Sequence, residues 1–453
     1  MNLRKMLSAT LCLSAWAGVT RADVVTDWNG VLLDVVREAD LPAPVAARAF
    51  AMMNVAMFDS INTFEKTHEA YLVDVDPAFG AVADVVAAAA ARRVLVVLFP
   101  DREADFNAAF DNFLPDLPEI VFTPSNDFGI GVANAILDFR EGDFSDVDLN
   151  YNPAGGAGEW QPTPPDFEDA LLPNWQFVTP FGIASGGQFR PSGPPDLTSA
   201  RYTEDYGEAV KYGEAGSPHR TDGQTEAAEF WSDPTGTNTA PGHWIEIAMI
   251  IAEDEGNTPA QNARVFALLS IALADAAVVA WDAKYAHDDW RPFTAIHALD
   301  DGNADTTPDL LWEPLLDTPP HPGYVSANAA FAGAATKMME IIYGRDGISF
   351  SATSDNNDAT RTFGSLSGAA EEAADASIWA GATFAYAGED GLIAGRALAA
   401  YVHATRLQRL IVVTAPSSDG CAPGGCGPGG LFTSMMLLVA YPVMRRTRRR
   451  RRN

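Results

Sequence analysis

Residues 263–285, ARVFALLSIALADAAVVAWDAKY, predict a helix that is apolar on nearly every face. Just before them, Thr258 suits the N-cap, Pro259 suits the first turn, and Gln261 can close a capping box with the threonine. A helix without a polar face is stable in water only when other helices cover it. We therefore expect a central helix that is surrounded by the rest of the chain.

Further stretches show the same apolar spacing. They are residues 28–39, 44–64, 79–99 and 126–140, and helical signals resume at Glu204 and Glu226. Between them, residues 141–199 are rich in Pro, Gly, Asp and Trp and predict an irregular segment. No alternating strand pattern of useful length is present. The sequence therefore predicts an all-α fold with long Pro/Gly-rich loops, built as one large helical core or as two packed bundles.

The two ends of the chain predict export. Residues 1–22 have a basic start, an apolar stretch and small residues before Asp23, as a secretory signal peptide has; a buried first helix is the alternative. Residues 416–453 contain a Gly/Pro/Cys hinge, a 14-residue apolar run and an arginine-rich end. The run is shorter than the roughly 20 residues of a spanning helix. We expect the helical domain to occupy residues 23–415.

The layout of this tail resembles the C-terminal sorting tails of bacterial surface proteins. In those proteins a membrane protease recognises the hinge motif and removes the helix. The resemblance implies that the chain is exported to the cell envelope or cell surface, where the tail anchors it in the membrane or is processed by such a protease.

Charge and cysteine content limit the partners of the body. The chain has 30 Lys and Arg against 60 Asp and Glu, and ten of the basic residues lie in the two end segments, so the body has 20 against 59 acidic ones. Such a body repels nucleic acid, and an anionic ligand needs a local pocket of positive charge. All three cysteines, Cys12, Cys421 and Cys426, lie in the end segments, so the body can have no disulfide and no cysteine–metal site.

An acidic loop follows the fourth helical stretch. Asp143, Asp146, Asp148 and Asn150 suggest a calcium loop, but counting from Asp146 there is no glycine at the sixth position and no glutamate at the twelfth. We therefore expect a solvated acidic loop, and the sequence gives no other metal site.

Two cations stand out in WDAKYAHDDWRPF, residues 281–293. Lys284 and Arg291 are seven residues apart, which places them on one face of a helix that Pro292 then ends. Two converging cations make an anion site. Alternatively, Asp282, Asp288 and Asp289 pair with them on the surface.

This pattern, in which a lysine is followed after six residues by Arg-Pro, resembles the first motif of the vanadium-dependent haloperoxidases and the type 2 phosphatidic acid phosphatases. The likeness to the bacterial haloperoxidase-like branch extends over about residues 28–410, and its most similar parts are residues 44–62, 158–167, 262–285 and 281–335. The resemblance implies two packed four-helix bundles around one oxyanion pocket. The pocket would hold vanadate as cofactor, with phosphate or sulfate as alternative anions.

The resemblance assigns residues to this pocket. Lys284 and Arg291 would neutralise the oxygens, Ser326 would hydrogen-bond one oxygen, and Ala327 would offer a backbone N–H at a helix start. Ser377 occupies the position of a third cation, an arginine, so one positive charge is missing.

Both histidines of the family pattern are also replaced. Asn328 stands at the acid/base histidine, and Thr383 stands at the histidine that binds vanadate or acts as the phosphatase nucleophile. An amide cannot take up a proton near neutral pH. Of the remaining histidines, His321 is the best substitute, because it lies five residues before Ser326; alternatively it caps or packs the loop.

Three functions remain open on this sequence. The first is an active haloperoxidase or acid phosphatase-like enzyme. The second is a homologue that binds a small oxyanion without turnover. The third is a surface-displayed binding or structural module with a vestigial pocket. Because both histidines are replaced, we expect the activity to be lost or altered.

Overall fold

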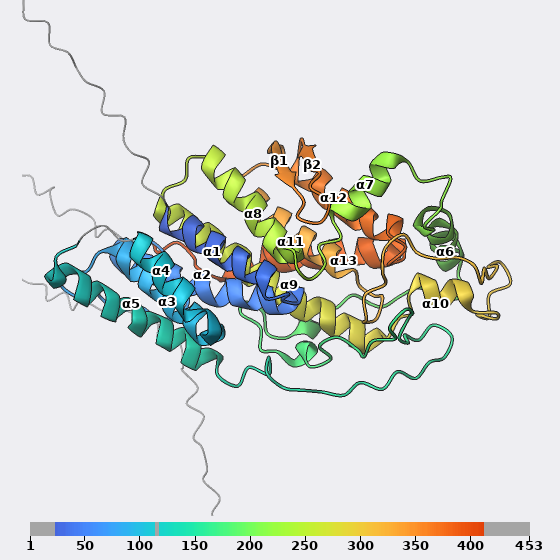
Figure 1. Cartoon of the computed structure of the whole chain (residues 1–453), viewed down its shortest axis with the longest axis horizontal. Coiled ribbons are helices and arrows are strands. Elements are labelled where there is room, and N and C mark those ends of the chain that lie inside the picture. Colours follow the sequence, from blue (N-terminus) through green and yellow to red (C-terminus); the bar gives the residue numbers. More distant parts are fainter. Residues whose placement is uncertain (1–22, 114–116, 412–453) are drawn as a thin grey trace, which may run out of the picture. The chain divides into compact units, whose positions relative to one another are not determined.

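The computed structural model describes residues 23–113 and 117–411, and their regular structure is almost entirely helical (Figure 1). The α-helices of the described residues are α1 Val24–Glu38, α2 Ala43–Glu65, α3 Ala83–Leu98, α4 Glu103–Phe113, α5 Glu119–Arg140, α6 Ala200–Gly213, α7 Asp222–Phe230, α8 Thr239–Asp254, α9 Pro259–His287, α10 Pro292–His297, α11 Ala327–Tyr343, α12 Leu366–Trp379 and α13 Ala385–Thr405. The all-α prediction is confirmed. The predicted signal peptide and C-terminal tail lie outside the described residues.

One short hairpin was not predicted. Strands β1 (Phe350–Thr353) and β2 (Thr360–Phe363) pair antiparallel, with Phe350 opposite Phe363. Each strand has four residues, which is too short for an alternating pattern to be recognised in the sequence.

Helix α9 is the predicted central helix. Thr258 accepts a hydrogen bond from the Gln261 backbone N–H, and the Gln261 side chain accepts one from the Thr258 backbone, which closes the expected capping box. Helices α1, α2, α8, α11 and α13 all contact α9. Among the described helices, α9 is the one long and apolar enough to cross a membrane, but 94% of its most apolar window is buried in the protein. Its apolar surface is therefore covered by other helices.

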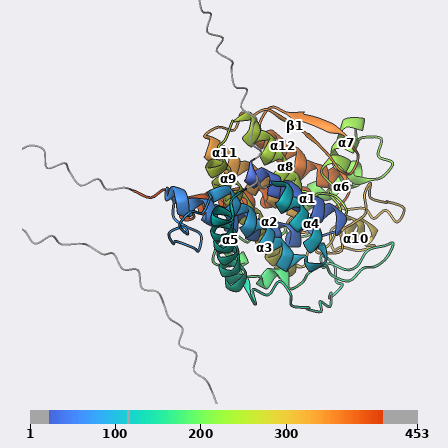
Figure 2. The ribbon, with the colours of Figure 1, turned by 60° about the vertical axis from the view of Figure 1, so that its left-hand side comes forward.

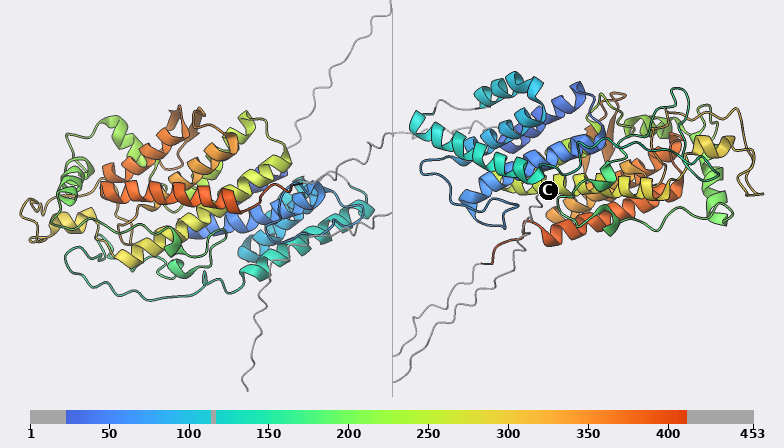
Figure 3. Two further views of the ribbon diagram at one scale, coloured as in Figure 1. Left: turned by 180° about the vertical axis from the view of Figure 1, so that it is seen from behind. Right: turned by 90° about the horizontal axis from the view of Figure 1, so that it is seen from below.

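The remaining helices form two groups that meet at α9. In the first group α3 packs against α2 and α5, and α1 and α4 pack on α3; Figure 2 shows these blue and teal helices together. In the second group α11 packs against α12 and α13, and α6 and α7 pack on α12. In the left view of Figure 3, α13 (orange-red) lies beside α9 and α11.

The irregular segment between α5 and α6 is tied to α9 by one buried carboxylate. The backbone N–H groups of Phe181, Gly182 and Ile183 donate to Asp275 over 2.6 to 3.0 Å. Burial raises the pKa of Asp275 to about 6, while these three hydrogen bonds act in the opposite direction. A segment with little regular structure beyond the short 3-10 helices Trp175–Phe177 and Gly186–Gln188 is thereby held on the core at a defined place.

The acidic loop after α5 differs in part from the expectation. Asp146 and Asp148 are exposed, as predicted, but Asp143 is buried and pairs with Arg48 at 2.9 Å and Arg140 at 2.7 Å. The prediction of a solvated loop is therefore wrong for Asp143, because two arginines from α2 and α5 neutralise it. In residues 23–113 and 117–411, no group of three or more His, Cys, Asp or Glu side chains is placed to hold a metal ion.

Glycines allow α11 and α13 to approach closely. A Cβ atom on Gly395 would lie 2.2 Å from the Ala330 carbonyl oxygen, and one on Gly391 would lie 2.7 Å from the Ser326 carbonyl oxygen. Neither distance is compatible with a side chain. The position of the first turn of α11 is therefore set by its backbone contact with α13.

We predict opposite effects for two helical Gly→Ala substitutions. Gly395→Ala should lower the free energy of unfolding by about 1–3 kcal/mol, because the helices must move apart. Gly30→Ala, where nothing lies within 4 Å, should raise it by about 0.5–1 kcal/mol through helix propensity. Urea denaturation measures both values. Equal effects at the two positions would contradict the close contact between α11 and α13.

Candidate functional site

Lys284 and Arg291 do not lie on one helix face, so this part of the prediction is wrong. Helix α9 ends at His287, and Asp288 has a left-handed backbone with φ of 52°. Arg291 is the N-cap of α10, so Pro292 starts a new helix and does not end the old one. An aspartate tolerates the left-handed conformation that stops α9. The turn still brings the two side chains to the same loop.

Both side chains are buried against main-chain carbonyl groups of the loop before α11, and Arg291 also contacts the carbonyl group of Ala382, between α12 and α13. The Lys284 Nζ donates to the carbonyl oxygens of Pro322 at 2.8 Å and Val325 at 2.7 Å. The Arg291 guanidinium donates to the carbonyl oxygens of His321 at 2.8 Å, Ala382 at 2.7 Å and Pro319 at 3.2 Å. Lys284 is 0% exposed and Arg291 1% exposed.

Burial changes the proton affinity of both side chains. Burial, with a smaller effect of the Arg291 charge, lowers the pKa of Lys284 well below its usual value. Burial lowers the pKa of Arg291 to about 9, so Arg291 remains charged at neutral pH.

His321 serves as a hydrogen-bond acceptor for Arg291. Its Nδ1 lies 2.9 Å from the Arg291 Nη2, and a guanidinium can only donate, so the proton of the imidazole is on Nε2. Burial and the charges of Lys284 and Arg291 lower the pKa of His321 well below its usual value. The ring also packs on Trp281, with centroids 5.2 Å apart. These contacts favour the packing role over the catalytic one.

Asp289 is buried rather than exposed on the surface. It accepts a hydrogen bond from the Tyr386 hydroxyl at 3.0 Å, and burial raises the pKa of Asp289 to about 7. Among the described residues, no carboxylate lies within 4 Å of the Lys284 or Arg291 nitrogens, and Asp282 pairs instead with Arg190. The alternative of surface ion pairs with Asp282, Asp288 and Asp289 is therefore wrong. Sequence reasoning missed the contact between Asp289 and Tyr386, because 97 residues separate them.

The hydroxyl groups assigned to the pocket lie beside the start of α11. Ser326 is the N-cap of this helix, and its Oγ accepts from the Ala329 N–H at 3.3 Å and lies 3.4 Å from the Ser377 Oγ. Ala327 is the first helical residue. The Ser377 hydroxyl donates to the Ala374 carbonyl oxygen at 2.6 Å, so Ser326 can donate to Ser377.

Thr383 and Asn328 are the remaining residues that the resemblance assigns to the pocket. The Thr383 N–H donates to the Ser377 carbonyl oxygen at 3.2 Å, and the preceding carbonyl, of Ala382, accepts from Arg291. The Thr383 Oγ1 is buried and has no hydrogen-bond partner. The Asn328 amide donates to the Trp231 carbonyl oxygen at 2.8 Å, which links α11 to the end of α7. The structure thus joins Lys284, Arg291, Ser326, Ser377 and Thr383 through a chain of contacts.

This arrangement has the chemistry of an oxyanion site without a proton-transfer group. The charged Arg291 and the N-terminal end of a 17-residue helix attract negative charge, and Lys284 adds to this attraction in its protonated form. A buried hydroxyl without a partner can donate to an anion oxygen. The neutral His321 is occupied by Arg291, and neither Asn328 nor Thr383 can act as an acid/base near neutral pH.

Comparison with known proteins gives matches to vanadium-dependent haloperoxidases. Residues 264–411 match the family model described as the VCPO second helical-bundle domain. Vanadium chloroperoxidase of Curvularia inaequalis is 32% identical over 180 residues. The match covers 33% of this chain, and the chain spans 29% of the length of that relative.

Two solved structures have a similar fold. The crystal structure of the first bacterial vanadium-dependent iodoperoxidase has a TM-score of 0.74 and 26% identity, covering 85% of this chain and 97% of the other. The holo-type bacterial vanadium-dependent chloroperoxidase has a TM-score of 0.64 and 16% identity, covering 81% and 92%. The second likeness concerns the fold alone.

We predict that Arg291→Lys is strongly destabilising. An ammonium group cannot supply the separated donors that reach three carbonyl oxygens and His321, so buried acceptors lose their partners. The free energy of unfolding should fall by about 2–4 kcal/mol in chemical denaturation. The control is Arg396→Lys, where the ion pair with Glu371 is 3.7 Å long and exposed, and the change should stay within about 0.5 kcal/mol. Similar losses for both variants would contradict the structural role of Arg291.

Proposed function

We propose that this chain, which belongs to the haloperoxidase branch of the vanadium-dependent haloperoxidase and type 2 phosphatidic acid phosphatase superfamily, holds a small tetrahedral oxyanion without peroxidase turnover. The observation that carries the proposal is a pair of buried cations without a carboxylate partner within 4 Å, at the start of a helix. Buried charge is costly unless it is paired, and a bound oxyanion would supply the missing charge.

Covalently held vanadate does not fit the residues of this site. The relatives are vanadium-dependent by name, and vanadate is the cofactor that the resemblance implies. In this chain Thr383 stands where the resemblance requires the histidine ligand, Asn328 stands at the acid/base position, and Ser377 replaces a cation. The unpartnered Thr383 hydroxyl fits an anion oxygen held by hydrogen bonding. Phosphate, sulfate or vanadate would bind here by charge and hydrogen bonds alone.

The second candidate, a surface module with a vestigial pocket, requires Lys284 and Arg291 to be neutralised within the protein. Ion pairs of these cations with Asp288 or Asp289 would do this, but no such pair lies within 4 Å among the described residues. The geometry therefore favours anion binding over the structural role.

We predict that phosphate raises the melting temperature at pH 6 and that Thr383→Val weakens the effect. The substitution keeps the shape of the side chain and removes a hydroxyl that has no partner, so the free protein should fold normally. Loss of a hydrogen bond to a charged ligand should lower the affinity about tenfold or more. Melting curves over a range of phosphate concentrations measure this change.

Two controls separate this site from general anion effects. Thr405→Val removes an exposed hydroxyl at the end of α13 and should leave the phosphate effect unchanged. Sulfate keeps its charge between pH 6 and 8, whereas Asp289 loses its proton near pH 7 and then repels the anion. The stabilisation by sulfate should therefore be larger at pH 6 than at pH 8, and Asp289→Asn should reduce this difference. Equal phosphate effects in the wild type and Thr383→Val would overturn the proposal.

We also propose that the protein is exported and that its C-terminal tail is anchored or processed at the cell envelope. The support is the order of basic, apolar and small residues in 1–22 and of hinge, apolar run and arginines in 416–453. Mass spectrometry of the protein from fractionated cells of its source organism should give a chain that begins at Asp23 in the envelope fraction. Recovery of an intact chain starting at Met1 from the cytoplasm would contradict export.

A further inference from the structure

A groove separate from the oxyanion site lies between α10 and the loop of residues 155–167. It has a volume of about 400 Å³, which is enough for a small organic ligand. None of the residues assigned to the oxyanion site lines it. Within residues 23–113 and 117–411, no lysine or arginine lines it either, and its one charged side chain is that of Asp300. The groove therefore disfavours anions, in contrast to the oxyanion site.

Backbone hydrogen bonds fix the two walls of the groove relative to each other. The Trp160 N–H donates to the Asp288 carbonyl oxygen at 2.7 Å, and the Trp290 N–H donates to the Gly158 carbonyl oxygen at 3.1 Å. The loop is thereby paired with the segment that leads into α10. A groove that is held by the main chain in the free protein needs little ordering when a ligand binds.

Aromatic side chains line both walls. On α10 the His297 ring stacks on Phe293, with centroids 4.2 Å apart and planes at 28°, and Trp290 is 1% exposed. On the loop Phe167 is 61% exposed and has a left-handed backbone with φ of 51°. This conformation is unfavourable for a bulky residue, and the exposed ring gains little packing in the free protein. A ligand in the groove would supply that packing.

Polar side chains of the groove keep free hydrogen-bonding groups. The His297 Nδ1 lies 2.8 Å from the Phe293 carbonyl oxygen, which can only accept, so Nδ1 carries a proton. The His297 Nε2, the Thr294 hydroxyl and the Gln161 amide have no hydrogen-bond partner among the described residues, and none of them is enclosed. Asp300 uses only one carboxylate oxygen, for a backbone N–H.

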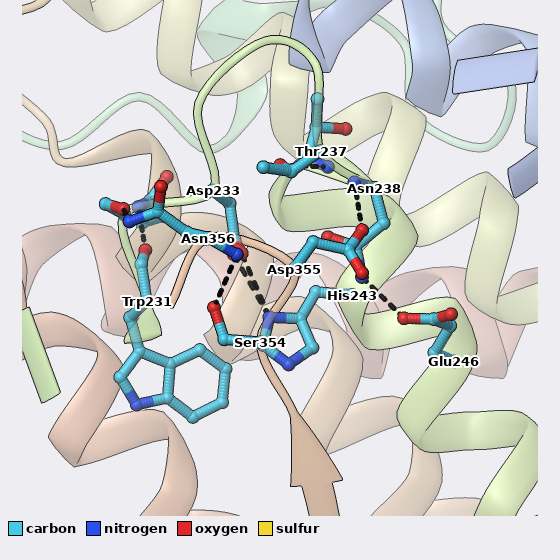
Figure 4. Close-up of polar contacts among 12 residues, drawn as sticks. Trp231, Asp233, Thr237, Asn238, His243, Glu246, Ser354, Asp355 and Asn356 are labelled. Atoms are coloured by element: carbon cyan, nitrogen blue, oxygen red, sulfur yellow. Dashed lines mark hydrogen bonds and ion pairs between the residues drawn. The ribbon is translucent and has the colours of Figure 1, made fainter. Parts of the chain in front are cut away.

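The buried His243 shows why the accessibility of His297 matters. The His243 Nδ1 lies 3.0 Å from an Asp233 carboxylate oxygen, and Figure 4 shows this pair near Trp231. The side chain is 1% exposed, and its ring packs against Trp231 and Phe230 with centroids 5.0 and 5.1 Å away. Burial opposes the charge of His243, but Asp233 outweighs it and raises the pKa of His243. His243 is therefore one half of an enclosed ion pair, whereas His297 can meet a ligand.

We propose that the groove binds a neutral pyranose sugar. The flat C–H face of the sugar ring would pack on Phe167 and on the stacked rings of Phe293 and His297. Its hydroxyl groups would pair with the free polar groups of the groove. A hydroxyl both donates and accepts, so it matches the His297 Nε2 in either protonation state. A pure hydrocarbon would leave these polar groups desolvated without partners, and an ammonium ion would find only one carboxylate.

Saturation-transfer NMR with cellobiose and sorbitol tests the proposal. Both probes carry many hydroxyl groups, but only cellobiose has rigid rings with flat C–H faces. We expect saturable binding of cellobiose with a dissociation constant of about 1 mM or lower, and at least tenfold weaker binding of sorbitol. Cellohexaose separates two sources of the sugar: tighter binding than that of cellobiose indicates a polymer, and equal binding indicates a free saccharide.

Three variants locate the binding. Phe167→Ala should weaken cellobiose binding about tenfold, because the exposed ring no longer packs on the sugar. Phe177→Ala is the matched control, at a phenylalanine that is 56% exposed and lies outside the groove, and it should leave binding unchanged. His297→Phe keeps a ring on Phe293 and removes Nε2, so it should weaken binding about fivefold.

Three results would overturn the proposal: no saturable binding of cellobiose, equal binding of cellobiose and sorbitol, or unchanged cellobiose affinity in both Phe167→Ala and His297→Phe. The effect of phosphate on the melting temperature should persist in Phe167→Ala, because no residue of the oxyanion site lines the groove. Failure of one proposal therefore leaves the other standing.

Discussion

The burial of Lys284 and Arg291 against main-chain carbonyl groups positions the residues of the candidate site. Two cations inside a chain with a formal net charge of −30 would ordinarily pair with carboxylates. Here their nitrogens donate instead to carbonyl oxygens of residues 319–325 and of Ala382, and the buried Asp289 carboxylate is hydrogen-bonded to Tyr386. Carbonyl groups stabilise positive charge without cancelling it, so the site keeps a positive charge that an oxyanion can use.

The same contacts hold the helix start in place. The loop that accepts from Lys284 leads directly into Ser326, and Gly391 and Gly395 of α13 allow the first turn of α11 to lie against its backbone. A cation pair, a helix N-terminus and the Ser377–Thr383 segment are therefore positioned by a continuous set of backbone contacts.

Local patterns in the sequence predicted much of the fold, and they failed where contacts are long-range. The capping box at Thr258 and the apolar α9 depend on neighbouring residues and were predicted correctly. The convergence of Lys284 and Arg291 was expected for the wrong reason, because the left-handed turn at Asp288 cannot be inferred from helical spacing. The Asp289–Tyr386 contact and the Asp233–His243 pair depend on tertiary packing that no spacing rule contains.

Equilibrium dialysis of vanadate and phosphate against the purified protein at pH 6 tests the central claim most directly. A site that holds an oxyanion by charge and hydrogen bonds alone should bind one equivalent of either anion, with dissociation constants that agree within about tenfold. Vanadate bound several orders of magnitude more tightly than phosphate, together with peroxide-dependent bromide oxidation, would contradict the account.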